Sequence, residues 1–165
     1  MTAQYRLDYQ SPLGILELVS SDTEIYALIF VEREHIVYVA QEDTPQVLLD
    51  CYQQIHEYFL GERQVFTVPY CFEGAGTAFQ QKVWQALTTV AYGQTASYKD
   101  IAQLINNEKA VRAVGGANNK NELTIIVPCH RVIGANGTLT GYGGGIWRKE
   151  WLLQHEQKFS SVQSD

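Results

Sequence analysis

The first forty residues of the chain contain short, largely apolar runs separated by polar residues, and the first of these runs, residues 5–9, alternates loosely with the two-residue period of a strand. The pattern predicts strands over residues 5–9, 15–19, 24–31 and 35–40, and Ser-Pro-Leu-Gly at residues 11–14 predicts a turn between the first two. Connections this short are typical of antiparallel strands. This part of the chain is therefore predicted to form an antiparallel sheet of three or four strands.

The period changes after Thr44, where a helix is predicted to begin. Thr44 suits the N-cap, Pro45 the first helical position and Gly61 the C-cap. Between them, apolar residues recur on one helical face: Leu48, Tyr52, Ile55 and Phe59. One helix is thus expected to accompany the sheet.

The remainder of the chain is predicted to be mainly helical. Capping boxes begin at Thr77 and Ser97, each with a partner side chain three residues later. Further helices are predicted over residues 110–118 and 147–157. The last of these is expected to turn four side chains inward: Trp147, Trp151, Leu152 and His155. The Gly-rich residues 71–76 suggest a boundary, so we expect an α+β protein with domains 1–76 and 77–165.

A continuous apolar run at residues 123–127 predicts a buried strand that leads into Pro128, Cys129 and His130. A thiol reacts as the thiolate, and neighbouring imidazole or cationic groups favour that form. Cys129 could therefore be an acceptor thiol that is alkylated directly, a thiol-hydrolase nucleophile, or an inert buried cysteine. Glu150 is an acidic candidate to orient His130, or else an exposed helical glutamate.

The predicted helices on either side of residues 106–107 have the pattern of a helix-turn-helix, and the second is unusually rich in small side chains. Glycine inside a helix costs roughly 1 kcal/mol relative to alanine, so Gly115 and Gly116 indicate a close approach to another surface. That surface could be a nucleic-acid groove, with Arg112 entering the base stack, or another helix, with Arg112 in solvent.

Charge is distributed unevenly along the chain. Residues 1–76 hold 3 Lys and Arg against 12 Asp and Glu, a net charge of −9, whereas residues 77–157 hold 8 against 5, a net charge of +3. The basic part contains Cys129. This asymmetry suggests an anionic partner for that part alone, although uneven surface charge is the simpler explanation.

The three cysteines are widely spaced, which favours free thiols, a reducing compartment and a cytoplasmic location. None of the Cys and His residues of the first domain has zinc-finger spacing. No apolar run approaches the roughly 20 residues of a membrane span. The glycine run at residues 141–145 could line a flat pocket with backbone groups, or could be an ordinary flexible loop.

The sequence Pro-Cys-His-Arg-Val at residues 128–132, with Asn121 before it and Tyr-Gly-Gly-Gly at residues 142–145 after it, resembles the O6-alkylguanine-DNA alkyltransferases. Ser97-Tyr98 and the run from Arg112 to Ala117 belong to the same resemblance, which extends from Ser11 to Glu156. It implies an N-terminal antiparallel sheet-plus-helix domain like that of ribonuclease H. It also implies a C-terminal helical domain that binds double-stranded DNA through a helix-turn-helix in the minor groove.

The resemblance also implies the reaction. An alkyl group would pass irreversibly from O6-alkylguanine, and from O4-alkylthymine, to Cys129 after the base is flipped out of the duplex, so that each molecule acts once. His130 would take the thiol proton through a water, and Glu150 would orient His130. Tyr98 would assist flipping and hydrogen-bond the base, while Asn121 would belong to a hinge between the DNA-reading helix and the active-site segment.

Two further groups of residues follow from the resemblance. DNA-binding residues would be Tyr98, Arg112, Ala113, Gly115 and Ala117, and the substrate pocket would include Val132, Tyr142, Gly143 and Gly144. Some family members hold a structural zinc, but the matching positions here include Thr2 and Ser21, so no metal is expected. The expected protein is a monomer without a cofactor and without a membrane partner.

Overall fold

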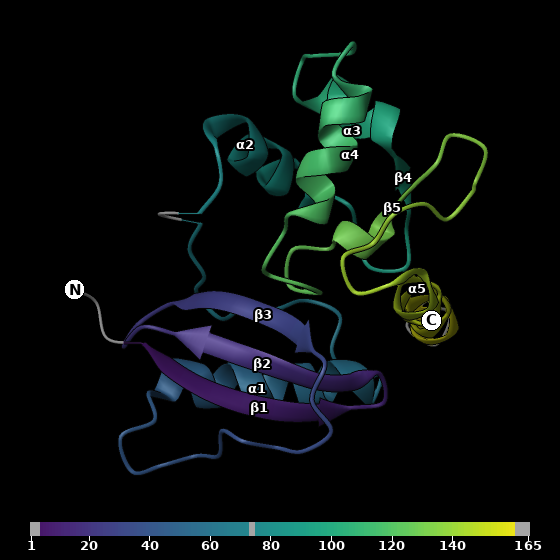
Figure 1. Cartoon of the computed structure of the whole chain (residues 1–165). Coiled ribbons are helices and arrows are strands. Elements are labelled where there is room, and N and C mark those ends of the chain that lie inside the picture. Colours follow the sequence, from purple (N-terminus) through teal and green to yellow (C-terminus); the bar gives the residue numbers. More distant parts are fainter. Residues whose placement is uncertain (1–3, 73–74, 161–165) are drawn as a thin grey trace. The chain divides into compact units, whose positions relative to one another are not determined.

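The computed structural model describes residues 4–72 and 75–160 of the chain. It has two compact units, Met1–Glu73 and Gly74–Asp165. The first unit contains a sheet and one long helix, and the second is mainly helical (Figure 1). The α+β class expected from the sequence is confirmed.

The first unit is built on an antiparallel sheet of three strands, β1 (Tyr5–Ser11), β2 (Gly14–Ser20) and β3 (Ile25–Val31), in the order β1-β2-β3. Helix α1 (Gln46–Phe59) covers one face of the sheet (Figure 1). Tyr9 of β1 packs against the Tyr52 and Phe59 rings of α1, with ring centroids 5.1 and 5.8 Å apart. Gly61 follows the helix with φ +80°, a conformation in which glycine avoids the steric penalty of a Cβ atom.

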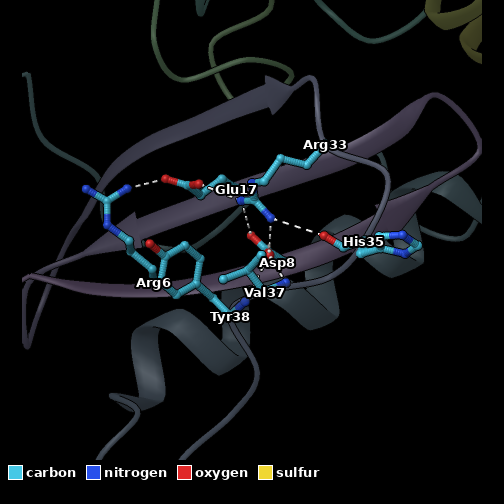
Figure 2. A network of polar contacts seen from close by, with 7 residues as sticks. All are labelled: Arg6, Asp8, Glu17, Arg33, His35, Val37 and Tyr38. Carbon is cyan, nitrogen blue, oxygen red and sulfur yellow. Dashed lines mark hydrogen bonds and ion pairs between the residues drawn. The ribbon is translucent and has the colours of Figure 1, made fainter.

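The opposite face of the sheet carries a network of charged residues. Asp8 and Glu17 are cross-strand neighbours on β1 and β2, and both are buried. Two carboxylates in that relation repel each other. Figure 2 shows Arg33 between them, donating to Asp8 over 2.7 and 3.0 Å and to Glu17 over 2.7 Å, while Arg6 pairs with Glu17 from the other side.

The predicted fourth strand at residues 35–40 is wrong. The backbone N–H groups of Val37 and Tyr38 donate to the Asp8 carboxylate over 2.8 and 3.0 Å, and Asp8 N donates to Tyr38 O over 2.9 Å (Figure 2). This segment therefore uses its N–H groups on a side chain instead of a strand ladder. Its strand-like apolar run gave no sign of that partner.

The second unit contains helices α2 (Ala78–Leu87), α3 (Tyr98–Leu104), α4 (Val111–Asn119) and α5 (Ile146–Ser160). The capping boxes at Thr77 and Ser97 are confirmed, with Gln80 and Asp100 as their partners. Asn106, at φ +57°, reverses the chain between α3 and α4. A short parallel pair, β4 (Ala96–Ser97) with β5 (Val132–Ile133), joins the start of α3 to the segment that follows Cys129.

Two further expectations for this unit are wrong. Residues 123–127 are buried but form turns instead of a strand, with Ile125 at φ +72° and Val127 N donating to Leu123 O over 2.9 Å. These residues are apolar because they are buried, and buried turns require apolar side chains as much as a buried strand does. Trp147, expected inward, is 56% exposed at the start of α5.

No helix in the described parts of the chain is both long and apolar enough to span a membrane. Of the two positions matching zinc ligands, Thr2 lies outside the described residues. The Ser21 hydroxyl accepts hydrogen bonds from Thr23 N and Glu24 N, over 3.2 and 3.1 Å.

Candidate active site

Cys129 begins a single 3-10 turn, η1 (Cys129–Arg131), directly after Pro128. The turn is closed by Arg131 N donating to Pro128 O over 3.0 Å. β5 follows at once, and its pairing with β4 holds the far end of the turn. The thiol is therefore held on both sides by backbone structure, and the residue is only 4% exposed.

Two asparagines connect the Cys129 segment to the end of α4. Asn118 Nδ2 donates to Cys129 O over 3.2 Å, and Asn121 Nδ2 donates to Cys129 Sγ over 3.2 Å and to Val127 O over 2.9 Å. Asn121 Oδ1 accepts from Leu123 N over 3.0 Å. The structure thus places Asn121 at the thiol and between α4 and the Cys129 segment, and it adds Asn118, which sequence reasoning missed.

The carboxylate that contacts His130 belongs to Glu156, so the expected pairing with Glu150 is wrong. His130 Nε2 lies 2.6 Å from Glu156 Oε2, and both residues are buried. Glu150 is exposed, and its carboxylate accepts from Gln154 over 3.2 Å. At 100° per residue, six positions along α5 turn the side chain to a different face. The sequence did contain a signal for Glu156. Leu152 was predicted to face inward, and a residue four positions later in a helix lies on the same face.

Arg131 holds Glu156 in place. Its Nε and Nη2 donate to the two carboxylate oxygens over 2.8 and 3.1 Å, and its Nη1 donates to Val90 O over 2.7 Å. Gly93 N also donates to Glu156, over 3.2 Å. Glu156 therefore stays charged in the interior, where it pairs with the Arg131 guanidinium. The same carboxylate also fixes the orientation of the His130 imidazole.

The electrostatics of the resting site favour neutral Cys129 and neutral His130. Burial raises the pKa of the Cys129 thiol, against the lowering effect of the Asn121 hydrogen bond. Burial also lowers the pKa of His130, although Glu156 opposes this. For Glu156, burial alone would raise the pKa, but His130 and Arg131 hold it well below its usual range. With Nε2 directed at Glu156, the second ring nitrogen, Nδ1, has no hydrogen-bond partner among the described residues.

The glycine-rich loop at residues 138–145 is tied to both α3 and α5. Thr140 Oγ1 donates to the Tyr98 hydroxyl over 3.1 Å, and Thr140 O accepts from Lys149 Nζ over 2.8 Å. Arg148 Nη1 donates to Gly144 O over 2.9 Å. Thr140 thus joins the loop to one residue of the expected site, Tyr98, and to one that was not expected, Lys149.

The other residues of the expected pocket lie along this loop or next to the thiol. A Cβ atom at Gly143 would lie 3.4 Å from Asn119 O, so the loop approaches the end of α4 closely. The Tyr142 hydroxyl is buried, and it is close enough to the thiol that it helps to lower the pKa of Cys129. Val132 is fully buried three residues after the cysteine. The side chains that these contacts place near the thiol are therefore those of Asn121 and Tyr142.

Helices α3 and α4 are consecutive and packed, and α4 turns small side chains outward. Arg112, Ala113 and Gly116 are exposed, and a Cβ atom at Gly116 would meet nothing within 4 Å. Gly115 faces the Tyr98 ring, 3.9 Å from where its Cβ would lie. Ala117 was expected on this surface, but it is 2% exposed. Its carbonyl accepts a hydrogen bond from Trp84 Nε1 over 2.8 Å.

The described residues contain no group of three or more His, Cys, Asp or Glu side chains that could hold a metal ion. The chemistry available at this site is that of a protected thiol, a neutral imidazole held by a carboxylate, and two tyrosine hydroxyls. Such a set can pass one proton and form one bond to sulfur.

Comparisons with known proteins agree over most of the chain. Residues 78–158 match the 6-O-methylguanine DNA methyltransferase DNA binding domain, and residues 5–71 match the ribonuclease-like domain of the same proteins. The constitutive methylated-DNA–protein-cysteine methyltransferase of Bacillus subtilis is 44% identical over 93% of this chain and 95% of its own. The corresponding protein of Haemophilus influenzae is 44% identical over 95% of this chain and 88% of its own.

A solved structure from Mycobacterium tuberculosis, of OGT in complex with DNA, superposes with a TM-score of 0.82 at 42% identity, covering 94% of each chain. The O6-methylguanine-DNA methyltransferase of Pyrococcus kodakaraensis superposes with a TM-score of 0.68 at 25% identity, covering 93% of this chain and 99% of its own.

Proposed function

The chain belongs to the 6-O-methylguanine DNA methyltransferase family, and we propose that it repairs DNA by transferring an alkyl group from guanine O6 to Cys129 Sγ. The observation that carries this proposal is a buried thiol next to a neutral imidazole, itself held by Glu156, in the same unit as an exposed small-residue helix. O4-alkylthymine is proposed as a second substrate. The same chemistry applies to it.

The proposed reaction is a direct displacement at the alkyl carbon. The thiol proton passes to His130 Nδ1 through a water, and the sulfur forms a bond to the alkyl carbon while the bond from that carbon to O6 breaks. The base leaves with the electron pair, and the Tyr98 hydroxyl donates to its ring to stabilise that charge. His130 suits the role of acceptor because burial keeps it neutral and Glu156 takes up its other nitrogen.

The product is a thioether, which has no easy route back to the thiol. We therefore propose that each molecule acts once. This distinguishes the protein from a thiol hydrolase, whose acyl intermediate would be released by water.

DNA is proposed to bind along α4, in the minor groove, with the damaged base flipped toward Cys129. A protein thiol cannot reach O6 inside the duplex, so the base must leave the stack. Support comes from the exposed face of α4, where Ala113 and Gly116 would let the backbone approach DNA and Arg112 is the long side chain that could fill the vacated position. Asn118 and Asn121 would then transmit the position of α4 to the thiol.

We also propose that the protein acts as a monomer in the cytoplasm. In the described part of the chain, none of the three cysteines forms a disulfide, which supports a reducing compartment.

The proposal is tested by the intact mass of the protein after incubation with excess duplex containing O6-methylguanine. We expect a gain of one methyl group and no more, and none in Cys129→Ser. Cys51→Ser is the matched control and should be methylated like the wild type, because burial raises the pKa of Cys51 to about 12 and leaves it inert.

Three results would contradict the proposal. Methylation of Cys129→Ser would place the acceptor elsewhere. Lesion-independent binding without an adduct would indicate a DNA-binding module that lacks the chemistry. Demethylation of more than one equivalent of DNA would indicate turnover.

A further inference from the structure

Thr140, in the glycine-rich loop, holds the hydroxyl group of Tyr98. Its Oγ1 donates to the Tyr98 hydroxyl over 3.1 Å. The carbonyl oxygen of the same residue lies 3.4 Å from that hydroxyl and accepts from Lys149 Nζ over 2.8 Å. The loop therefore meets the phenol oxygen with both a side chain and a backbone group of one residue, and that backbone group is tied to α5.

Backbone elements on both sides set this contact. Tyr98 is the first residue of α3, and a Cβ atom at Gly115 of α4 would lie 3.9 Å from its ring. On the loop side, Thr140 precedes Gly141, whose φ is +22° and where a Cβ atom would lie 2.9 Å from Asn119 Nδ2. The loop thus turns closely against the end of α4 at the point where it presents the Thr140 hydroxyl to Tyr98.

These contacts leave the Tyr98 proton weakly held. Hydrogen bonds between two oxygen atoms span about 2.5–3.0 Å, so the 3.4 Å separation from Thr140 O is long. That carbonyl is also engaged by Lys149 Nζ. The phenol oxygen accepts the shorter bond, from Thr140 Oγ1, and a hydroxyl that accepts one hydrogen bond becomes a stronger donor of the next. Tyr98 is thus prepared to donate to a further acceptor.

We propose that Thr140 is the positioning residue for Tyr98 in alkyl transfer, because its hydroxyl directs the phenol proton toward the flipped base. The inference rests on the proposed function, in which the base is the acceptor. As the bond from the alkyl carbon to O6 breaks, the electron pair stays on the base, and the Tyr98 hydroxyl donates a hydrogen bond to the ring while keeping its proton. Thr140 acts only through Tyr98.

Single-turnover transfer from free O6-benzylguanine and from O6-methylguanine duplex tests this role. Thr140→Val replaces the hydroxyl by a methyl group of similar size, so transfer should slow by about 2- to 10-fold, as expected for the loss of one hydrogen bond. Thr140→Ser keeps the hydroxyl and should restore the rate. Thr138→Val is the matched control, because the Thr138 hydroxyl lies in the same loop but donates to Asn136, and its rate should equal that of the wild type.

A double-mutant cycle with Tyr98→Phe separates positioning from packing. Tyr98→Phe removes the donor itself and should slow transfer by about 10- to 100-fold. In that background Thr140→Val should cause no further loss, because no phenol proton remains to be directed. If Thr140 only supported the loop, its replacement would slow both backgrounds equally.

The contact itself is tested without DNA or substrate, by NMR of protein labelled with carbon-13 at the ζ carbon of tyrosine. The chain has 10 tyrosines, and the resonance that is missing from Tyr98→Phe belongs to Tyr98. Thr140→Val should shift that resonance, because the ζ carbon bears the oxygen that accepts the hydrogen bond. Thr138→Val should leave it in place.

The inference is overturned by an unshifted Tyr98 resonance in Thr140→Val, by a wild-type transfer rate in that variant, or by equal slowing with and without the Tyr98 hydroxyl. Failure of the proposed function gives a different result. The wild type would then gain no alkyl group from either substrate, while its Tyr98 resonance still responded to Thr140→Val.

Discussion

At the scale of single residues, the proposed reactivity of Cys129 depends on groups that are close in space and distant in sequence. His130 is its neighbour in the chain, but the carboxylate that orients His130 is Glu156, twenty-six residues later. Glu156 also neutralises Arg131 inside the unit. One carboxylate therefore contacts both the buried guanidinium and the imidazole, whereas Glu150 lies on the exposed side of the same helix.

This difference predicts opposite behaviour for two similar substitutions. Glu156→Gln leaves Arg131 as an uncompensated buried charge, so the free energy of unfolding should fall by about 3–5 kcal/mol. It also releases the His130 ring, and alkyl transfer should slow by roughly 100-fold or more. Urea denaturation and single-turnover transfer from O6-methylguanine duplex measure the two effects.

Glu150→Gln is the control for that experiment. As a surface change it should alter stability by no more than about 0.5 kcal/mol and leave the transfer rate unchanged. Equal losses for the two variants would mean that the position of Glu156 next to His130 has no catalytic consequence.

At the scale of elements, α4 combines a buried side with an exposed side that offers no large side chain near its middle. Val114, Ala117 and Asn118 face the interior, and Gly116 faces open space. Nothing within the described residues packs against Gly116, so helix packing does not explain a glycine there. Approach of another molecule does explain it, and the proposed molecule is DNA.

Gly116→Ala tests this explanation. The substitution should stabilise the helix by about 1 kcal/mol, because alanine has the higher helix propensity and its Cβ meets no atom. Affinity for duplex DNA should nevertheless fall, since the methyl group separates the helix from the groove. Thermal denaturation and fluorescence anisotropy with labelled duplex measure the two changes.

Alkyl transfer from free O6-benzylguanine is the internal control for Gly116→Ala, because a free base needs no groove and its rate should not change. A more stable variant with unaltered DNA affinity would show that this face of α4 is not the interface.

At the scale of the whole molecule, the described residues of each unit include a buried cluster of opposite charges. In the first, burial would raise the pKa of Asp8, but the hydrogen bonds from Arg33 and from the backbone of residues 37 and 38 hold it below its usual range (Figure 2). In the second, His130 and Arg131 do the same for Glu156. Both clusters therefore stabilise the folded chain only while their carboxylates are ionised.

Acid should destabilise the protein in a defined order. The pKa of His130 is lowered on folding, so the unfolded chain takes up the proton first and stability should begin to fall below about pH 6.5. Asp8 and Glu156 also have lowered pKa values, so a steeper loss should follow below about pH 4. The urea midpoint of unfolding, followed by circular dichroism between pH 7 and 3, measures the effect. All three tryptophans of the chain lie between residues 84 and 151, so their fluorescence reports on the second unit. A midpoint that stays constant to pH 4 would contradict the role assigned to His130.

The sequence by itself determined whatever depends on neighbours in the chain. The capping boxes at Thr77 and Ser97 involve side chains three residues apart, and the period of the apolar residues distinguishes the strands of the first unit from its helix. The motif around Cys129 identified the family, because the order of those residues is itself the signal.

Only the tertiary structure decided the features that need a distant partner. Residues 35–40 have the apolar composition of a strand, yet the Asp8 carboxylate takes up the N–H groups of Val37 and Tyr38. Residues 123–127 are apolar because they are buried, and burial does not specify a strand. Glu156 looks like an ordinary residue of a helix until the chain folds and brings its carboxylate to His130. The reason is physical: local periodicity encodes which side of an element is buried, whereas the pairing of a buried charge is settled only when two elements pack together.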